Sequence, residues 1–532
     1  MPLILSQIAL PLDADEKEAV NIALKKLGLS PQNTEAAIYR RSVDARRGRG
    51  VRRVYAVYVD AGRQEERLLR RFESDANILR APRNASLNIL RGTRPLLHRP
   101  VVVGMGPAGL FAALLLARQG LKPLLLERGA ELARRVEQVD RFFSGGHLDE
   151  NTNVQFGEGG AGTFSDGKLV TRTGDSRIAF VMDTFVEHGA PRDILIEANP
   201  HIGTDRLRPI ISSIRSEVAA LGGQAHTECT LTGLNLKDGK LSALHTSMGD
   251  IPCSVAVLAL GHSARDTLLT LYSQGLLMEK KPFSVGVRME HTQQLVDTLF
   301  YREAAGHPSL PSAEYRLSHR EGVRGCYTFC MCPGGVVVPA ASERAGVVTN
   351  GMSYAARADV NANAALVASV LPDDISGDAM DAIAFQRELE GAAYRAGGGA
   401  YCAPAQSAQS FLSDSCAPSS THASYARGVR TARLEPLLPT FVSSLLKSGL
   451  RRFDRSYPGL GGTEGVLTGL ETRTSSPLRI VRGDNMESVG IKGVYPAGEG
   501  AGYAGGIVSA AVDGVRVAQA ILALYGEVTS PS

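Results

Sequence analysis

Three glycines in the first quarter of the chain have the spacing that binds the pyrophosphate of a dinucleotide. Gly104, Gly106 and Gly109 fit G-x-G-x-x-G between a short β-branched run and a longer apolar segment. The first glycine allows a tight turn, the second lets backbone approach the phosphates, and the third packs the helix on the strand. The N-terminus of that helix offers unpaired N–H groups to an anion. Glu127, eighteen residues after Gly109, is placed to accept hydrogen bonds from a ribose.

Two arginines could clamp a carboxylate or phosphate of a substrate through paired hydrogen bonds. Arg288 follows a strand-like Ser-Val-Gly-Val run, where a buried cation needs a partner such as Glu290 or an anionic ligand. Arg473 lies in a polar stretch before the last glycine-rich segment, and it could equally pair with Glu471 as scaffold. Both interpretations, anion clamp and structural ion pair, stay open for each arginine.

Cys330 is a candidate nucleophile, and with Cys332 it forms a C-x-C pair that could be redox-active. The alternative is that both are small buried residues on a strand beside a Pro-Gly-Gly turn. Cys326 extends the spacing to C-x-x-x-C-x-C without a convincing fourth ligand, so no metal site is predicted. His201 and Lys168 are candidate acid–base groups, and loop hydrogen bonding explains each of them as well.

The elements that must position these residues form a strand–helix–strand unit that is interrupted and later resumed. The expected elements are strands at 101–103, 123–126, 255–260 and 493–497, and helices at 110–119, 204–221 and 508–524. A glycine-rich turn, 498–507, joins the last strand to the last helix. The stretch 157–169 has five glycines, and its flanking apolar residues favour an ordered loop against the ligand over a flexible linker.

The length of 532 residues exceeds a single core, so several domains are expected. We predict four segments: an α+β module at 1–96, the first part of a cofactor-binding domain at 97–282, an inserted substrate or cap domain at 283–469, and the C-terminal part of the cofactor-binding domain at 470–532. Within the insertion, the Ala- and Asn-rich stretch near 359–370 is expected to be a helix. The Ser-, Pro- and Gly-rich stretch 397–424 is expected to be a long ordered loop.

Composition points to a globular protein of the cytoplasm. Hydrophobic residues make up 44% and charged residues 21% of the chain. No apolar run approaches the roughly 20 residues of a membrane span, and the N-terminal run lacks the basic residues that open a secretory signal. Seven widely spread cysteines favour reduced thiols, and hence a cytoplasmic location.

The positive charge of the chain belongs to its N-terminal segment. Residues 1–99 hold 19 Lys and Arg against 11 Asp and Glu, which gives +8, whereas the whole chain carries only +4. Seven arginines lie within residues 38–53 and could bind the phosphates of a nucleic acid. Without an aromatic-rich RNA-binding signature, we favour the alternative that these arginines border a hairpin or pair with acids such as Asp44.

Nine motifs spread over nearly the whole chain resemble a bacterial family of NAD(P)/FAD-dependent oxidoreductases of the two-dinucleotide-binding-domain type. They are SVDAR (42–46), GMGPAG (104–109), FGEGGAGTFSDGKL (156–169), HIGTD (201–205), FSVGVRMEH (283–291), CMCPGG (330–335), NGMS (350–353), ETRTSSP (471–477) and GEGAGYAGGI (498–507). The resemblance implies an α/β fold in which a discontinuous Rossmann-like FAD-binding domain carries an inserted α+β substrate or cap domain and a small N-terminal α+β domain.

The resemblance also implies FAD as cofactor and assigns residues to it. The predicted cofactor-binding residues are Gly104, Gly106, Pro107, Ala108, Gly109, Glu127, Arg128, Gly160, Gly162, Thr163, Gly261, Gly498, Glu499, Gly505, Gly506 and Ile507. By this similarity Glu499 would meet the ribityl or phosphate region, and the last helix would direct its N-terminus at the pyrimidine end of the flavin. Such a helix end stabilises the negative charge that reduction leaves there by roughly 0.3–1 kcal/mol.

These observations predict an FAD-dependent oxidoreductase that transfers a hydride or electron pair between the flavin and a small molecule. A second G-x-G-x-x-G unit is not evident, since 261–266 has one glycine and the glycines at 397–399 follow no strand. A tightly held nicotinamide is therefore not expected, and the donor is either NAD(P)H that docks transiently or another source of electrons. Two alternatives are a flavin-dependent tRNA-modifying enzyme, suggested by the basic N-terminal segment, and a non-enzymatic flavin sensor or scaffold.

Overall fold

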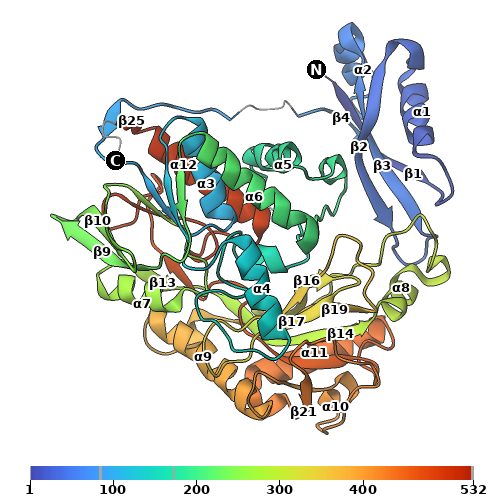
Figure 1. Ribbon diagram of the computed structural model, residues 1–532. Coiled ribbons are helices and arrows are strands. Elements are labelled where there is room, and N and C mark those ends of the chain that lie inside the picture. Colours follow the sequence, from blue (N-terminus) through green and yellow to red (C-terminus); the bar gives the residue numbers. More distant parts are fainter. Residues whose placement is uncertain (1, 83–86, 172–173, 529–532) are drawn as a thin grey trace.

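The computed structural model describes residues 2–82, 87–171 and 174–528 (Figure 1). At its centre lies a five-stranded parallel sheet in the order β24-β12-β6-β7-β8. Its strands are β6 (Val101–Val103), β7 (Leu124–Leu126), β8 (Gln224–His226), β12 (Ala256–Leu258) and β24 (Val494–Pro496). The strand before the last glycine-rich turn thus returns to the sheet that begins with the first glycine-rich unit. This arrangement confirms the Rossmann-like α/β prediction.

Both faces of this sheet are covered, which explains the continuous apolar runs of β6, β7 and β12. Val102 points to a helical layer, whereas Val101 and Val103 point to the opposite face. The helical layer consists of α3 (Pro107–Arg118), α5 (Arg177–Glu187), α6 (Thr204–Ala220) and α12 (Ile507–Leu522) (Figure 1). The other face is covered by a second, three-stranded sheet and a helix: β9 (Leu231–Lys237), β10 (Lys240–Thr246), β11 (Gly249–Pro252) and α7 (Arg265–Ser273).

A seven-stranded sheet in the order β15-β16-β19-β14-β22-β20-β21 forms the lower half of Figure 1. Its strands are β14 (Phe283–Thr292), β15 (Ser318–Glu321), β16 (Arg324–Cys332), β19 (Asn361–Val370), β20 (Ala403–Ser407), β21 (Val429–Thr431) and β22 (Val466–Glu471). The accompanying elements are α8 (Gln293–Tyr301), α9 (Ala379–Ala396), α10 (Ala408–Leu412), α11 (Thr440–Ser456) and the ribbon β17 (Val336–Pro339) with β18 (Thr349–Met352).

The two faces of this sheet differ in chemistry. On β14, Val287 and Met289 belong to an apolar core that includes α11. The alternating residues Arg288 and Glu290 are polar, yet both are fully buried. Strand geometry places successive side chains on opposite faces, so the polar residues share the face turned away from α11.

Two expectations for the insertion are wrong. Residues 361–370 form the strand β19, because they pair along their length with β14 on one side and with β16 on the other. Tertiary pairing overrides the helix propensity of alanine, and small side chains suit a central strand buried on both faces. The stretch 397–424 is not one long loop, since it contains β20 and α10.

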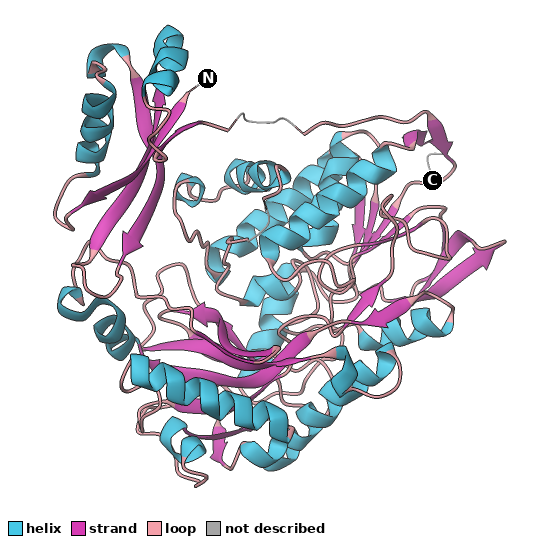
Figure 2. Cartoon of the chain, turned by 180° about the vertical axis from the view of Figure 1, so that it is seen from behind, coloured by secondary structure: helices cyan, strands magenta, loops and turns pink. Residues whose placement is uncertain are grey.

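The N-terminal residues fold as a β-α-β-β-α-β unit with an antiparallel sheet in the order β2-β3-β1-β4, the ferredoxin-like arrangement. The elements are β1 (Leu3–Leu10), α1 (Glu16–Leu27), β2 (Glu35–Asp44), β3 (Arg52–Asp60), α2 (Glu65–Arg71) and β4 (Ile78–Arg80). Figure 2 shows this unit standing beside the larger body, with α1 on the outer side of its sheet.

The arginine-rich segment is the turn between β2 and β3, and it contacts the rest of the protein. Arg46 pairs with Asp44 at 2.6 Å. Arg47 donates to the carbonyl of Ser456, and its guanidinium lies 4.6 Å from the ring centroid of Tyr457. Arg302 donates to the carbonyls of residues 45, 46 and 49 in the turn. The arginine-rich turn is thus a hairpin that packs against Arg302, Ser456 and Tyr457, and one of its arginines pairs with an acid, Asp44.

We expect Arg47→Ala to lower the free energy of unfolding by about 1 kcal/mol, because it removes a cation–π contact and a hydrogen bond between segments. Arg46→Ala removes a surface ion pair within the same turn and should leave stability unchanged. Urea denaturation of both variants measures the difference. Equal stabilities would show that the Arg47 contact contributes nothing.

Two short pairings join distant segments. Strand β5 (Arg94–Leu96) pairs with β25 (Tyr525–Val528), and β13 (Met278–Lys280) pairs with β23 (Leu478–Ile480).

All seven cysteines are free thiols. Among the described residues, no helix combines the length and apolarity needed to cross a membrane.

Candidate functional site

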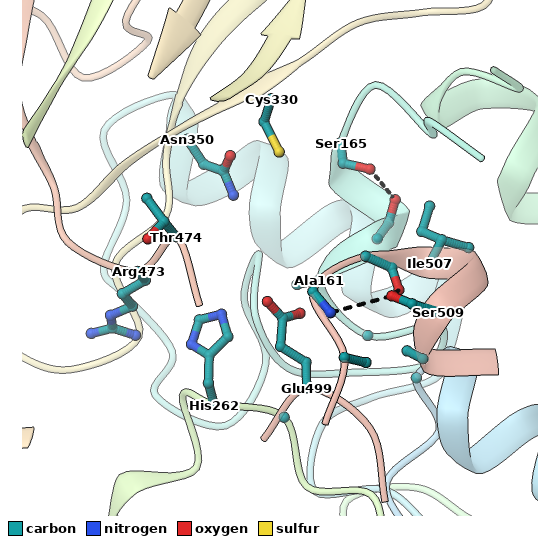
Figure 3. Close-up of a pocket in the computed structure, with 18 of the residues that line it drawn as sticks. Ala161, Ser165, His262, Cys330, Asn350, Arg473, Thr474, Glu499, Ile507 and Ser509 are labelled. Carbon is teal, nitrogen blue, oxygen red and sulfur yellow. Dashed lines mark hydrogen bonds between the residues drawn. The ribbon is translucent and has the colours of Figure 1, made fainter. Parts of the chain in front are cut away.

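The first and last glycine-rich turns line one cavity of about 1270 Å³. Gly106 and Gly160 face each other across a narrow gap, since a Cβ built on Gly106 would lie 3.7 Å from the Cα of Gly160. At the C-terminal turn, Gly162 approaches Ile507, the first residue of α12. Segments some 400 residues apart in the sequence therefore meet at one site, which Figure 3 shows from within.

The three glycines of the first motif differ in what surrounds them. Gly104 has φ +101°, and a Cβ there would overlap the carbonyl of Ala259. A Cβ on Gly109 would overlap the carbonyl of Gly104. Gly106 has ordinary φ −75° and opens to the cavity. The first and third glycines are thus required by the fold, whereas the second leaves room for a ligand.

Glu127 lies at the end of β7 and is only 5% exposed. Its carboxylate accepts backbone N–H bonds from Met105 at 2.9 Å, Gly129 at 3.0 Å and Gly157 at 2.9 Å. It therefore fixes the first glycine turn and the loop that follows β7, while its side chain also lines the cavity. Arg128 lines the cavity too and pairs with Asp266 at 2.6 Å.

The glycine-rich loop 157–169 is ordered by a buried arginine. Arg135, on α4 (Leu132–Phe143), is fully buried and donates to five carbonyls, those of residues 153, 154, 157, 158 and 160. Its Nη1 also donates to Thr163. Burial lowers the pKa of Arg135 to about 9. These hydrogen bonds account for an ordered loop against the cavity rather than a flexible linker.

At the C-terminal turn, a Cβ on Gly505 or Gly506 would meet no atom within 4 Å. Both glycines lead into the N-terminus of α12, so its first N–H groups face the cavity. Glu499 also lines the cavity and is half-buried. Burial raises the pKa of its carboxyl to about 7, against the opposing effect of nearby Lys281.

Most of the residues proposed from sequence line the cavity. They are Gly104, Gly106, Pro107, Ala108, Glu127, Arg128, Gly160, Gly162, Lys168, Gly261, Cys330, Arg473, Glu499, Gly505, Gly506 and Ile507. Outside its walls lie Gly109, Thr163, His201, Arg288 and Gly498. Gly109 and Thr163 support the walls through the packing and hydrogen bonds described above, and the N–H of Gly498 donates to Asp513 on α12.

Both candidate clamp arginines have carboxylate partners. Arg288 pairs with Glu471 at 2.6 Å rather than with Glu290. Arg473 pairs with Glu390 at 2.7 Å rather than with Glu471. Each ion pair is buried and has two hydrogen bonds. The geometry thus supports a structural ion pair, rather than an anion clamp, for both arginines.

The two candidate acid–base residues lie in neighbouring backbone segments, but they have different surroundings. Lys168 and His201 form an isolated antiparallel bridge. The Lys168 ammonium is 2.8 Å from Asp166, which also pairs with Arg357 at 2.6 Å. His201 has its Nε2 3.3 Å from the carbonyl oxygen of Ala355, and burial lowers its pKa. Of these two candidates, Lys168 alone borders the cavity.

Cys330 projects into the cavity from an irregular point of β16. The register between β16 and β19 shifts between Phe329 and Cys332, and Cys330 has φ +41°. Such a bulge redirects a side chain, and here the thiol faces the space opposite Glu499 (Figure 3). Burial by the surrounding walls raises the pKa of the Cys330 thiol to about 12. The thiol itself is exposed to the cavity, so a small reagent that enters the cavity can reach it.

We expect iodoacetamide to alkylate Cys330 slowly at pH 7.5 and progressively faster toward pH 10, because the thiolate is the reactive form. Cys416, which is exposed at the surface, serves as an internal control in the same sample. Peptide mass spectrometry measures both rates. Rapid alkylation of Cys330 at pH 7.5 would contradict the raised pKa of its thiol and favour its role as a nucleophile.

His262 and Lys281 are among the titratable residues of the walls that sequence reasoning missed. His262 follows Gly261 at the carboxyl end of β12, which is where parallel sheets place ligand-contacting residues, so this position was a usable signal. Burial, with the nearby cations Arg473 and Arg265, lowers the pKa of His262 to about 3. Lys281 enters the cavity from the link between β13 and β14, and no sequence pattern distinguishes it from its neighbour Lys280.

The cavity fits FAD. Gly106, Gly505 and Gly506 leave backbone open where a dinucleotide needs close approach, and the N-termini of α3 and α12 face the same space. Acidic side chains suited to bind hydroxyl groups, Glu127 and Glu499, stand at separate points of the wall. An elongated molecule with a central pyrophosphate and hydroxyls on either side matches this donor set.

Comparisons with known proteins agree with this cofactor. Residues 282–474 match the family described as "FAD-dependent protein, C-terminal domain-like", and residues 1–60 match a domain of unknown function. An uncharacterized protein of Clostridium beijerinckii is 43% identical over 528 residues, which cover 98% of this chain and 99% of that protein.

Solved structures show more distant similarity. L-amino acid deaminase from Proteus vulgaris is 12% identical, with 82% of this chain and 97% of that chain covered and a TM-score of 0.34. Glycine oxidase from Geobacillus kaustophilus is 12% identical, with 81% and 95% covered and a TM-score of 0.35. Scores this low carry no argument about substrate. The chain belongs to the same family as the Clostridium protein, and its residues 282–474 form a domain of the kind described for FAD-dependent proteins.

Proposed function

We propose that the protein is an FAD-dependent oxidoreductase that transfers a hydride or electron pair between the cofactor and a small molecule. The supporting observation is that one cavity runs from the glycine turns to the seven-stranded sheet. Its volume of about 1270 Å³ exceeds the roughly 300–1,000 Å³ of a pocket for one small ligand. A second molecule therefore has room beside the cofactor.

The chain's own residues would divide the work of holding the cofactor. The turn from Gly104 to Gly106 and the N-terminus of α3 would hold the pyrophosphate, and Glu127 the adenosine ribose. Glu499 would accept from the ribityl hydroxyls. When bound, FAD supplies the hydride-transfer chemistry, and the N-terminus of α12 would favour negative charge at its pyrimidine end.

Neutral polar groups contribute to the substrate end of the cavity. His262, Asn350 and Thr474 border it, and Figure 3 places His262 next to Glu499. Because its pKa is far below neutrality, His262 is an uncharged hydrogen-bonding group. Asn350 accepts from Arg288 through its Oδ1 and keeps its amide N–H groups for a ligand. These residues would orient a substrate by hydrogen bonds.

Anaerobic mixing with NADH or NADPH tests the proposed activity. Loss of the flavin absorbance near ~450 nm within the time of mixing would support an oxidoreductase with a nicotinamide donor. A nicotinamide donor would dock only transiently, so we expect saturation only at high donor concentration. Failure of NADH, NADPH and a panel of small-molecule reductants to bleach the flavin would contradict the proposal and favour a flavin sensor.

A further inference from the structure

Two half-buried charged residues on the cavity wall have no partner in the described part of the chain. The half-buried side chains of Lys281 and Glu499 form no hydrogen bond and no ion pair within 4.0 Å. Other buried or half-buried charges of the wall are compensated, among them Arg128 by Asp266, Lys168 by Asp166 and Arg473 by Glu390, whereas Arg316 and Arg320 are exposed to solvent. The two exceptions are close enough for each to oppose the effect of burial on the other's pKa.

Leaving a cation and a carboxylate half-buried but apart is unfavourable, because each loses water without gaining a hydrogen bond. Burial accordingly lowers the pKa of Lys281 and raises that of Glu499. The penalty is removed by a ligand that lies between them, accepts from the ammonium and donates to the carboxylate. Hydroxyl groups next to an electron-rich ring provide this combination.

We propose that Lys281 contacts the cofactor, with its ammonium donating to the flavin ring while Glu499 accepts from the ribityl hydroxyls. This inference rests on the proposed FAD-dependent function. Lys281 also lowers the pKa of His262, which places it near this residue of the substrate end. Its backbone N–H donates to Pro477, in the segment that carries Thr474 into the cavity. This location favours the ring over the pyrophosphate, which the α3 turn would hold.

The consequence is electrostatic. Reduction adds negative charge to the ring, and a nearby ammonium in a partly desolvated site stabilises that charge more strongly than the oxidised form. Lys281 would thus raise the midpoint potential of the bound flavin, and Glu499 would lower it. In this proposal Lys281 contacts the cofactor and does not donate a proton.

Lys281→Met tests the proposal against Lys280→Met as a matched control. Lys280 is the preceding residue, but its ammonium donates to the carbonyl of Ile375 and does not line the cavity. Midpoint potentials are measured by anaerobic dithionite titration with a reference dye, and FAD affinities by reconstitution of the apoprotein. We expect Lys281→Met to have a more negative potential and about tenfold weaker FAD binding. Lys280→Met should match the wild type.

Two further variants keep the test decisive if Lys281→Met folds poorly. Lys281→Arg keeps the charge and should retain the wild-type potential, whereas Glu499→Gln should shift the potential in the positive direction. Wild-type potential in Lys281→Met, whatever its FAD affinity, would overturn the contact with the ring. A wild-type protein that binds no FAD would instead refute the proposed function itself, and with it this inference.

Discussion

Gly106→Val should fold normally and lose FAD binding by at least about a hundredfold, or roughly 3 kcal/mol. Gly106 has φ −75° and ψ −178°, which valine adopts without strain. The Cβ of the new side chain would meet no protein atom closer than the Cα of Gly160 at 3.7 Å. Because Gly106 lines the cavity, we expect the methyl groups to extend into the space assigned to the pyrophosphate. Flavin fluorescence on titration of FAD into the apoprotein gives the affinity.

Gly109→Val is the informative contrast, because a Cβ there overlaps the carbonyl of Gly104 and should disrupt the fold itself. Circular dichroism and thermal unfolding separate the two cases. We expect a native spectrum for Gly106→Val and a destabilised protein for Gly109→Val. Wild-type FAD affinity in Gly106→Val would show that the first glycine turn does not hold the cofactor.

Glu390→Ala should lower the free energy of unfolding by about 3–5 kcal/mol, the largest single effect on stability that we expect. Glu390 is 2% exposed and pairs with Arg265 and Arg473, each at 2.7 Å. Its loss leaves two buried guanidinium groups with fewer compensating charges. The nearby Glu343 is more exposed and pairs with Arg387 at the surface, so Arg387→Ala should cost far less.

The same carboxylate has a predictable pH dependence. Burial alone would raise the pKa of Glu390, but Arg265 and Arg473 overcome it and lower the pKa below its ordinary value of 4.5. The stabilisation is therefore present above about pH 4.5 and is lost as the pH falls through the lowered folded-state value. Urea unfolding at pH 7 and at pH 4 should show a smaller acid-induced loss for Glu390→Ala than for the wild type. Equal losses would contradict the ion-pair assignment.

The parts of the site that local sequence specifies were predictable. The turn from Gly104 to Gly109 requires glycine at both ends because neighbouring backbone leaves no room for a side chain. The same glycine spacing therefore recurs in turns that bind a dinucleotide, and it can be identified from sequence. The return of the C-terminal strand to the first sheet followed from a repeated strand–turn–helix pattern. Glu127 was placed correctly at the end of β7, although its three backbone hydrogen bonds to the loops were not foreseen.

The features that depend on long-range packing were not predictable. Residues 361–370 are a strand because β14 and β16 flank them, and nothing within the Ala- and Asn-rich segment encodes those neighbours. The carboxylate partners of Arg288 and Arg473 were not predicted for the same reason. For each arginine the sequence suggested an acid close by in the chain, Glu290 and Glu471 respectively. The fold instead pairs Arg288 with Glu471 and Arg473 with Glu390. Lys281 gains its significance only from the cavity into which the fold directs it.

The central claim is that the two distant glycine turns together hold one FAD per chain. Denaturing the purified protein after incubation with FAD and desalting, then quantifying the released flavin by chromatography, tests it most directly. The account predicts one FAD for each chain, and far less than one for Gly106→Val. Release of no flavin from the correctly folded wild-type protein, or of FMN in place of FAD, would contradict it.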